Sequence, residues 1–183
     1  MRVALFGGSF NPPHVAHQLV ALYVLETEPV DELWMIPCFK HPFDKDLAPF
    51  ADRLAMCRLA AAPLGKRVRV SEVEGDLGGD SRTLRTIKEL QRRFPEHAFS
   101  LVIGADLEEE SKSWYGADEL RRLVPFVVVG RPGFSQQGVV MPDISSTEVR
   151  GRLAARDWPT RLVSRAVLDF IREKRLYEPP VSS

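Results

Sequence analysis

The sequence predicts a single α/β domain built on a doubly wound, mostly parallel β-sheet. Short apolar runs that end at glycine or proline alternate along the chain with longer segments of helical periodicity. Strands that alternate with helices form a parallel sheet with helices on both faces. A chain of 183 residues is long enough to bury one such core.

Five segments have the character of strands. Residues 3–6 form an apolar run that stops at two glycines, and residues 33–37 form a second run that stops at a proline. Residues 68–73 alternate between apolar and polar side chains, which predicts a half-buried strand. Residues 99–103 and 125–129 complete the set, and each leads into a glycine.

Six segments are expected to be helices. Asn11 is a good N-cap residue and Pro12 or Pro13 suits a first helical turn, so the first helix should run from there to about residue 26. Asp52 and Arg53 open the second helix, which carries apolar residues as far as residue 60. The other expected helices are 83–94, 114–123, 147–155 and 163–174.

Composition excludes several classes of protein. Lys and Arg together number 25, as do Asp and Glu, so a broad electrostatic surface for nucleic acid is not expected. No apolar run approaches membrane-spanning length, and a cytoplasmic location is expected. Cys38 and Cys57 form no C-x-x-C pair and are expected to be reduced packing residues, although the sequence leaves a disulfide between them open. Residues 1–178 are expected to form the domain and residues 179–183 a frayed tail.

Ligands of doubly wound sheets bind beyond the carboxyl ends of the strands. The segments that follow strands here are 7–17, 38–45, 104–106 and 130–133. The segment 38–49, which includes residues 38–45 and those after them, has no periodicity and is expected to be a functional loop.

The segment 7–17 has the properties of a phosphate site. Gly7 and Gly8 let the backbone approach a ligand closely, and Ser9 adds a hydroxyl donor. The N–H groups at the start of the following helix favour an anion at the same place. His14 and His17 lie one turn apart and share a face, so both imidazoles can donate to phosphate oxygens as charge develops. The ordinary alternative is a glycine turn followed by two surface histidines.

A second phosphate segment lies near the other end of the chain. Ser145, Ser146 and Thr147 precede a helical run, so they can cap it and leave N–H groups for phosphate. Arg150 lies one turn inside and can hold phosphate oxygens in a bidentate fork. A helix cap followed by a solvated arginine is the ordinary alternative.

These two segments resemble the signatures of one family. Residues 7–17 resemble the G-G-[ST]-F-[DN]-P-x-H-x-x-H segment of the nicotinate mononucleotide adenylyltransferases, which belong to the H-x-G-H nucleotidyltransferase superfamily with a Rossmann-like fold. Asn11 stands where Asp is commoner, and Ala16 stands where Gly is commoner. Residues 144–150 resemble the I-S-S-T-x-x-R motif of the same family.

The resemblance implies three catalytic residues and a set of ATP-binding residues that includes two of them. The implied catalytic residues are His14, His17 and Arg150. The residues implied to bind ATP are Gly7, Gly8, Ser9, Phe10, His17, Gly104, Asp106, Ser145, Ser146, Thr147 and Arg150.

Weaker similarities to the family's segments lie between these two motifs. Residues 103–106 followed by Trp114 resemble its I-G-x-D…W segment, which implies nucleotide contacts for Asp106 and stacking of Trp114 on the pyridine ring; a core aromatic is the alternative for Trp114. Thr83 and Arg131 match the S-Y-T and R-P-G segments that meet the mononucleotide. Arg82 replaces the usual Tyr.

The loop 38–45 matches the family's P-P-H-K segment only in part. Lys45 is the preferred phosphate contact of this loop, and Lys40 is the second choice. The residues implied to bind the mononucleotide are thus Lys45, Thr83, Asp106, Trp114 and Arg131.

The resemblance implies transfer of the adenylyl group of ATP to nicotinate mononucleotide, with Mg²⁺ on the phosphates and no all-protein metal site. Small-molecule substrates are thus the expected partners, without nucleic acid or membrane. Alternatives are an adenylyltransferase for nicotinamide mononucleotide or phosphopantetheine, and a nucleotide-binding regulator without the chemistry. The choice between nicotinate and nicotinamide depends on backbone geometry, and both this choice and the oligomeric state are left open.

Overall fold

The computed structural model describes residues 1–41, 46–134 and 139–178. Five parallel strands form one sheet in the order β3-β2-β1-β4-β5. The strands are β1 (Arg2–Gly8), β2 (Glu32–Pro37), β3 (Val68–Val70), β4 (Ala98–Gly104) and β5 (Phe126–Val129). The chain builds outward from β1 to β3 and then crosses to the other side of β1, so the strand order reverses between β1 and β4. This confirms the predicted doubly wound parallel sheet.

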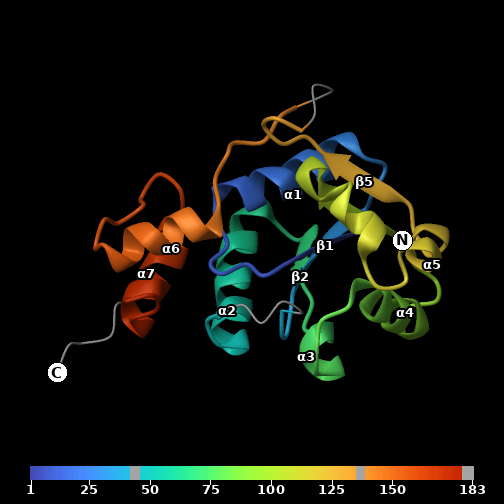
Figure 1. The fold of residues 1–183 in the computed structure, drawn as a ribbon, viewed down its shortest axis with the longest axis horizontal. Helices are drawn as coiled ribbons and strands as arrows, with labels where there is room; N and C mark the ends of the chain where they lie inside the picture. Colours follow the sequence, from blue (N-terminus) through green and yellow to red (C-terminus); the bar gives the residue numbers. More distant parts are fainter. Residues whose placement is uncertain (42–45, 135–138, 179–183) are drawn as a thin grey trace.

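Helices cover both faces of the sheet, as the ribbon in Figure 1 shows. The helices are α1 (Val15–Thr27), α2 (Phe50–Ala61), α3 (Val73–Leu77), α4 (Thr83–Arg93), α5 (Ala117–Leu123), α6 (Ser146–Ala154) and α7 (Arg165–Lys174). Short 3₁₀ turns at Ala62–Leu64, Ala105–Leu107 and Glu110–Ser113 connect some of them.

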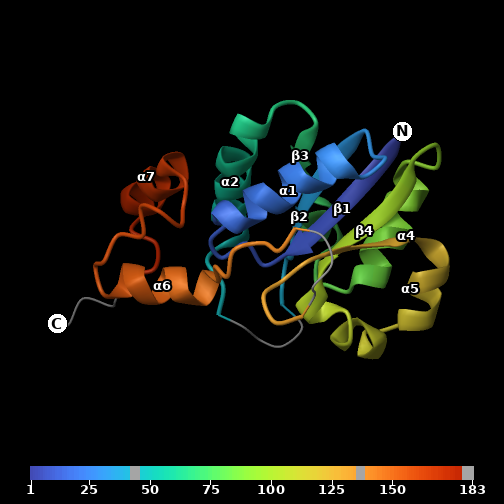
Figure 2. The same ribbon diagram turned by 90° about the horizontal axis from the view of Figure 1, so that it is seen from above.

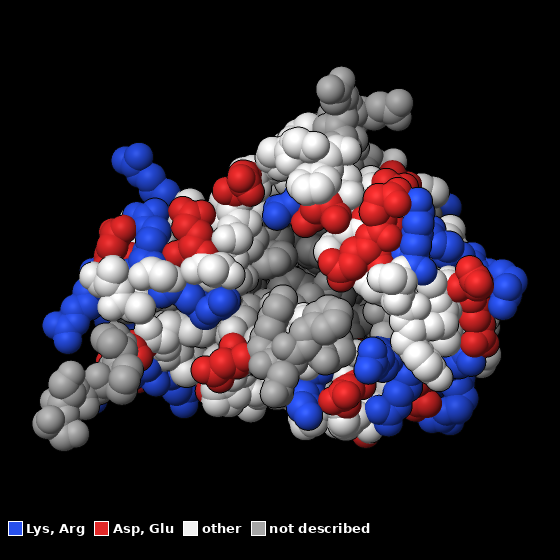
Figure 3. All heavy atoms as spheres, in the orientation of Figure 1, with Lys and Arg blue, Asp and Glu red and all other residues white. Residues whose placement is uncertain are grey.

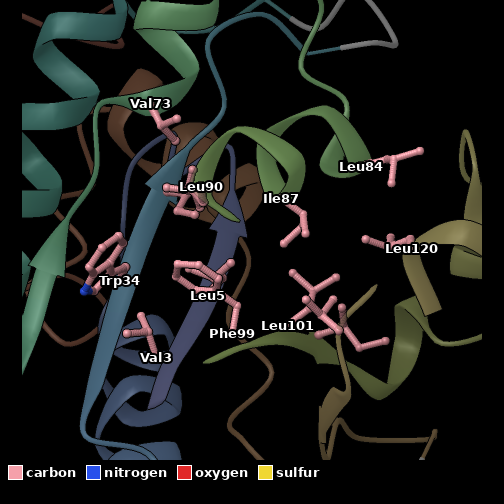
Figure 4. Packing of buried hydrophobic residues seen from close by; sticks show 13 residues of the cluster. Val3, Leu5, Trp34, Val73, Leu84, Ile87, Leu90, Phe99, Leu101 and Leu120 are labelled. Atoms are coloured by element: carbon pink, nitrogen blue, oxygen red, sulfur yellow. The ribbon is translucent and has the colours of Figure 1, made fainter. Parts of the chain in front are cut away.

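One face of the sheet packs against α3, α4 and α5. Alternate strand residues such as Leu5, Trp34 and Leu101 point to this face, since successive side chains of a strand point to opposite sides. Ile87 and Leu90 of α4 meet them (Figure 4). Burying a side chain of this kind contributes roughly 1.5–3 kcal/mol to folding.

The opposite face packs against α1 and α2. Here Ala4, Leu33 and Met35 of the strands meet Val24 of α1 and Cys57 of α2. A third cluster joins α6 and α7 to α2 and to the start of α1, so these two helices lie beyond one end of the sheet, beside α2 (Figure 2). The C-terminal helices thus reach the strand ends at which a ligand is expected.

Three predicted element boundaries were wrong. The first helix begins at Val15 with His14 as N-cap, because the Asn11 side chain bonds to other segments instead of capping the helix. The strand expected at 68–73 stops at Val70, and Val73 begins α3 inside a stretch expected to be a loop. The helix expected at 114–123 is α5, which begins only at Ala117, after Gly116 adopts a left-handed conformation with φ 67°.

Several smaller expectations can also be compared with the structure. No disulfide joins Cys38 to Cys57, and burial raises the pKa of Cys57. His97 contacts the rings of Trp34 and Phe99 and stacks on Phe94 with ring centroids 5.4 Å apart. Within the described part of the chain, no helix combines the length and the apolar character needed to cross a bilayer. The tail 179–183 lies outside the described residues.

Candidate active site

A cavity of about 990 Å³ lies at the carboxyl ends of β1 and β4, where the strand order reverses. Figure 3 shows that this face of the molecule is hollowed near its centre. The walls come from the loop after β1, the turn after β4, the start of α6 and the turn that follows α7. Segments from both ends of the chain therefore meet at the place where ligands of such sheets bind.

Side-chain donors from other segments bind the backbone carbonyls of the loop after β1. The Ser9 carbonyl accepts from Arg53 Nη1 at 3.0 Å, and the Asn11 carbonyl accepts from Arg150 Nη1 at 2.8 Å. Ser146 Oγ donates to the Pro12 carbonyl at 2.9 Å. With these carbonyls engaged, the N–H groups of Ser9 and Phe10 donate no hydrogen bond to another described residue.

The conformation of this loop suits an anion. Phe10 has φ 44°, and a left-handed residue after an extended strand turns successive N–H groups toward one concave side. Gly8 gives the Phe10 ring room beneath the turn, because a Cβ there would lie 3.2 Å from that ring and the ring would have to shift slightly. Gly7 has open space where a Cβ would be, and both glycines line the cavity.

His14 and His17 form a stacked pair in the cavity wall. Their ring centroids are 3.7 Å apart with 29° between the planes. His17 Nδ1 accepts the backbone N–H of His14 at 3.1 Å, so a neutral His17 carries its proton on Nε2. The sequence prediction that the two imidazoles share a face is confirmed.

Both imidazoles are neutral near pH 7. Burial, with help from the charge of Arg131, lowers the pKa of His14 to about 4. Burial, together with the charges of His14 and Arg131, holds the pKa of His17 well below its usual value. Each ring is therefore a hydrogen-bond donor rather than a permanent cation.

Asp106 and Arg131 follow β4 and β5. They lie on the other side of the switch point, which is the place between β1 and β4 where the strand order reverses. Arg131 Nε lies 3.6 Å from Asp106 Oδ1, and each side chain is about a third exposed or less. Gly104 makes this arrangement possible, since a Cβ at that position would collide with Asp106 Oδ1. All three residues line the cavity.

The second predicted motif begins α6. Ser145 is the N-cap, and its side chain accepts the Glu148 N–H at 3.1 Å, as expected. Arg150 Nη2 donates to Thr147 Oγ1 at 3.3 Å while Nη1 reaches Asn11. Ser146 and Arg150 were predicted to hold phosphate oxygens; in this structure each also binds a carbonyl of the first motif, so the two motifs form one wall.

Three further residues support this wall and were not predicted as site residues from the sequence. Asn11 is buried, and its Oδ1 accepts the Ala48 N–H at 3.1 Å and the Tyr177 hydroxyl at 2.8 Å. Arg53 is 1% exposed and donates to the carbonyls of Ser9 and of Cys38, Phe39 and Ala48. Arg53, which lies among apolar residues of α2, was a usable signal; for Tyr177 the sequence offers none.

Not every predicted site residue reaches this cavity. The Phe10 ring is buried behind it, 4.9 Å from the His17 ring, so it supports His17 from beneath. Thr83 begins α4 and Trp114 packs against the first core cluster, and neither lines the cavity. Lys45 lies outside the described residues, and Lys40 pairs with Asp80 at 3.5 Å.

The fold and the site together define a nucleotidyltransferase. Residues 5–152 match the family model described as cytidylyltransferase-like, which covers most of the chain. A probable nicotinate-nucleotide adenylyltransferase of Anaeromyxobacter sp. (strain K) is 47% identical, with 96% of each chain covered. Its counterpart in Myxococcus xanthus is 36% identical, covering 97% of this chain and 95% of the relative. The chain belongs to the nicotinate-nucleotide adenylyltransferase family.

Solved structures with low sequence identity share the fold. Nicotinic acid mononucleotide adenylyltransferase of Plasmodium falciparum, complexed with NaAD, matches with a TM-score of 0.82 at 21% identity, covering 96% of this chain and 97% of that one. A putative nicotinate-nucleotide adenylyltransferase of Vibrio parahaemolyticus matches with a TM-score of 0.74 at 19% identity, covering 93% and 98%.

Proposed function

We propose that this chain transfers the adenylyl group of ATP to nicotinate mononucleotide, giving nicotinate adenine dinucleotide and pyrophosphate in NAD biosynthesis. Family membership supports the reaction class, and the names of the relatives support the acceptor. The observation that carries the proposal is the bond from Arg150 Nη1 to the Asn11 carbonyl, because it joins both phosphate motifs in one cavity wall. Since the reaction consumes ATP, the proposal includes a cytoplasmic location.

The reaction needs little covalent chemistry from the protein. An oxygen of the mononucleotide 5′-phosphate attacks the α-phosphorus of ATP, and the bond from that phosphorus to the oxygen bridging to the β-phosphorus breaks. The electron pair leaves with pyrophosphate. A phosphate monoester is already a competent nucleophile, so the protein positions the two anions and stabilises the charge that develops.

His17 has the role closest to the reacting atoms in this account. Its Nδ1 is occupied by the His14 N–H, so its Nε2–H is the group that donates to an α-phosphate oxygen. A neutral donor gains strength as the oxygen becomes more negative, which favours the transition state over the bound substrate. His14 acts beside it, on the same ATP phosphates.

The leaving pyrophosphate is bound on the α6 side of the cavity. Arg150 has N–H donors besides those bound to Asn11 and Thr147, and the N-terminal N–H groups of α6 favour an anion. Gly7, Gly8 and Ser9 contribute backbone from the first motif to the same cavity.

ATP enters with a divalent ion as part of the substrate, and we take this ion to be Mg²⁺. Among the described residues, no three His, Cys, Asp or Glu side chains are grouped to hold a metal ion. Mg²⁺ commonly binds through one or two carboxylates with phosphate and water oxygens. Asp106 is the carboxylate of the switch point that could take part.

The acceptor binds on the side of Asp106 and Arg131. Arg131 can pair with the 5′-phosphate, since a guanidinium suits phosphate oxygens in a fork. Thr83, Trp114 and Lys45 complete the proposed acceptor site. Thr83 and Trp114 do not line the described cavity, and Lys45 lies outside the described residues.

The proposal is tested by pyrophosphate release from the purified chain with MgATP and one acceptor at a time. Nicotinate mononucleotide, nicotinamide mononucleotide and phosphopantetheine are compared by kcat/KM. The proposal predicts the highest kcat/KM with nicotinate mononucleotide. A higher value with another acceptor would transfer the assignment to that acceptor, and no release with any of them would support a regulator without the chemistry.

A further inference from the structure

The turn that follows α7 closes one side of the cavity and touches the first motif. Arg175 to Glu178 line the cavity, and Tyr177 Oη donates to Asn11 Oδ1 at 2.8 Å. Tyr177 has φ 64°, a left-handed conformation that is unfavourable for a bulky residue. Such a conformation persists only where surrounding contacts hold it, and it is enriched at functional sites.

The hydroxyl of Tyr177 has a specific partner. Asn11 is 2% exposed, and its Oδ1 takes two donors, the Tyr177 hydroxyl and the Ala48 N–H. Its Nδ2 donates to the Asp46 carbonyl at 3.3 Å, which fixes the orientation of the amide. Burial raises the pKa of Tyr177, so the phenol keeps its proton and remains a donor.

Asn11 transmits this constraint to the histidines. Its own carbonyl is bound by Arg150, and the next carbonyl, that of Pro12, is bound by Ser146. Two residues further on, His14 caps α1 and donates its N–H to His17. A shift of the Asn11 side chain therefore displaces the segment on which both imidazoles depend.

We propose that Tyr177 is a positioning residue for adenylyl transfer, whose hydroxyl fixes Asn11 and through it the loop that holds His14 and His17 in the cavity. This inference rests on the proposed function. It assigns to the C-terminal turn a part in the reaction, in addition to its packing.

The packing role belongs to a different part of the side chain. The Tyr177 ring packs against the third core cluster, which joins α6 and α7 to α2. Phenylalanine keeps the ring and removes only the hydroxyl, so Tyr177→Phe separates positioning from anchoring. Tyr23→Phe is the matched control, because its ring packs against the second core cluster and its hydroxyl bonds to no described residue.

The experiment measures kcat and KM with MgATP and nicotinate mononucleotide for both variants and for the wild type. Loss of one buried hydrogen bond predicts a fall in kcat of about 3- to 10-fold in Tyr177→Phe. KM for the mononucleotide and the melting temperature should stay near the wild-type values. Tyr23→Phe should match the wild type.

A double-mutant cycle with Asn11→Ala tests the route of the effect. If Tyr177 acts through Asn11, Tyr177→Phe causes no further fall in kcat in the Asn11→Ala background. An unchanged kcat in Tyr177→Phe, an equal fall in both backgrounds, or a variant that fails to fold would each overturn the inference. An inactive wild type would instead contradict the proposed function, so the two failures are distinguishable.

Discussion

The imidazole of His17 accepts the backbone N–H of His14 on Nδ1, at 3.1 Å, while the two rings stack. This bond is the half of a capping box that Glu or Gln at the third helical position usually makes. It fixes the tautomer of His17 and leaves Nε2–H as its donor. One side chain thus caps α1 and keeps a hydrogen-bond donor for the reaction that we propose.

The two nitrogens of His17 can be tested separately. Gln places an amide N–H near the position of Nε2, whereas Asn places an acceptor near the position of Nδ1 and does not reach further. We expect His17→Ala and His17→Asn to lower kcat by on the order of a hundredfold or more, as removal of a transition-state donor does. His17→Gln should retain more turnover than His17→Asn, measured by pyrophosphate release.

Stability should separate both amide variants from the alanine variant. His17→Gln and His17→Asn each keep an acceptor for the His14 N–H, so their melting temperatures should lie above that of His17→Ala. Equal kcat in the Gln and Asn variants, or normal kcat in His17→Ala, would remove Nε2 from the mechanism.

Stability should fall in mild acid because of His14. Its pKa is about 4 in the folded protein and 6.5 in the unfolded chain, so between these values the unfolded chain binds a proton that the folded one does not. The free energy of unfolding therefore decreases as pH falls from about 6.5 toward 4, by up to about 1.4 kcal/mol per pH unit. His17 acts in the same direction.

Urea unfolding of the wild type and of His14→Gln at pH 7, 6 and 5 measures this contribution. All other titrating groups are common to the two proteins, so the difference between their slopes reports on His14 together with its effect on the pKa of His17. The variant should lose less stability on acidification. Equal slopes would mean that His14 titrates in the folded protein as it does in the unfolded chain.

The fold was largely predictable, because each strand and helix carries its own local pattern. Residues 3–6 lead to two glycines, and α4 has apolar residues at helical spacing, so both appear where expected. The start of the first helix was predicted wrongly because a side chain bonds to residues that are distant in the sequence. Asn11 has the chemistry of a helix cap, but Ala48 and Tyr177 compete successfully for its amide.

Gly104 should be sensitive to a single added methyl group. In Gly104→Ala the Cβ would collide with Asp106 Oδ1, and because Asp106 is about a third exposed it can move away. We expect little change in melting temperature but a fall in kcat/KM for the mononucleotide of about tenfold or more, since small displacements of positioning groups cost heavily.

Gly151→Ala is the matched control for this change. It lies in α6 with open space around the added Cβ, so it should keep its activity and gain slightly in stability. Normal kcat/KM in Gly104→Ala would exclude Asp106 and Arg131 from acceptor binding.

Arg53 should be required for folding of the site. It is fully buried, forms no ion pair with a described residue, and donates to four backbone carbonyls. A lysine has only three N–H donors and cannot bind all four carbonyls. Arg53→Lys should therefore lower the free energy of unfolding by about 3 kcal/mol or more. Arg58→Lys, on the exposed side of the same helix, should change it little, and equal effects of the two substitutions would contradict this role.

The candidate site was only partly predictable. His14, His17 and Arg150 have sequence neighbours that indicate phosphate binding, and the cavity brings them together. Arg53 and Tyr177 act on backbone and amide groups far away in the chain, so their partners depend on the folded topology. Phe10 lies within the motif, yet its ring is buried behind His17, a difference that only packing decides.

The most direct measurement is a ³¹P NMR time course of the purified chain with MgATP and nicotinate mononucleotide. Adenylyl transfer predicts that the monoester resonance of the mononucleotide and the three resonances of ATP disappear together, one for one. Pyrophosphate and a dinucleotide diphosphate should replace them, and His17→Ala should slow all these changes equally. Formation of ADP and inorganic phosphate, with the mononucleotide resonance unchanged, would contradict the account.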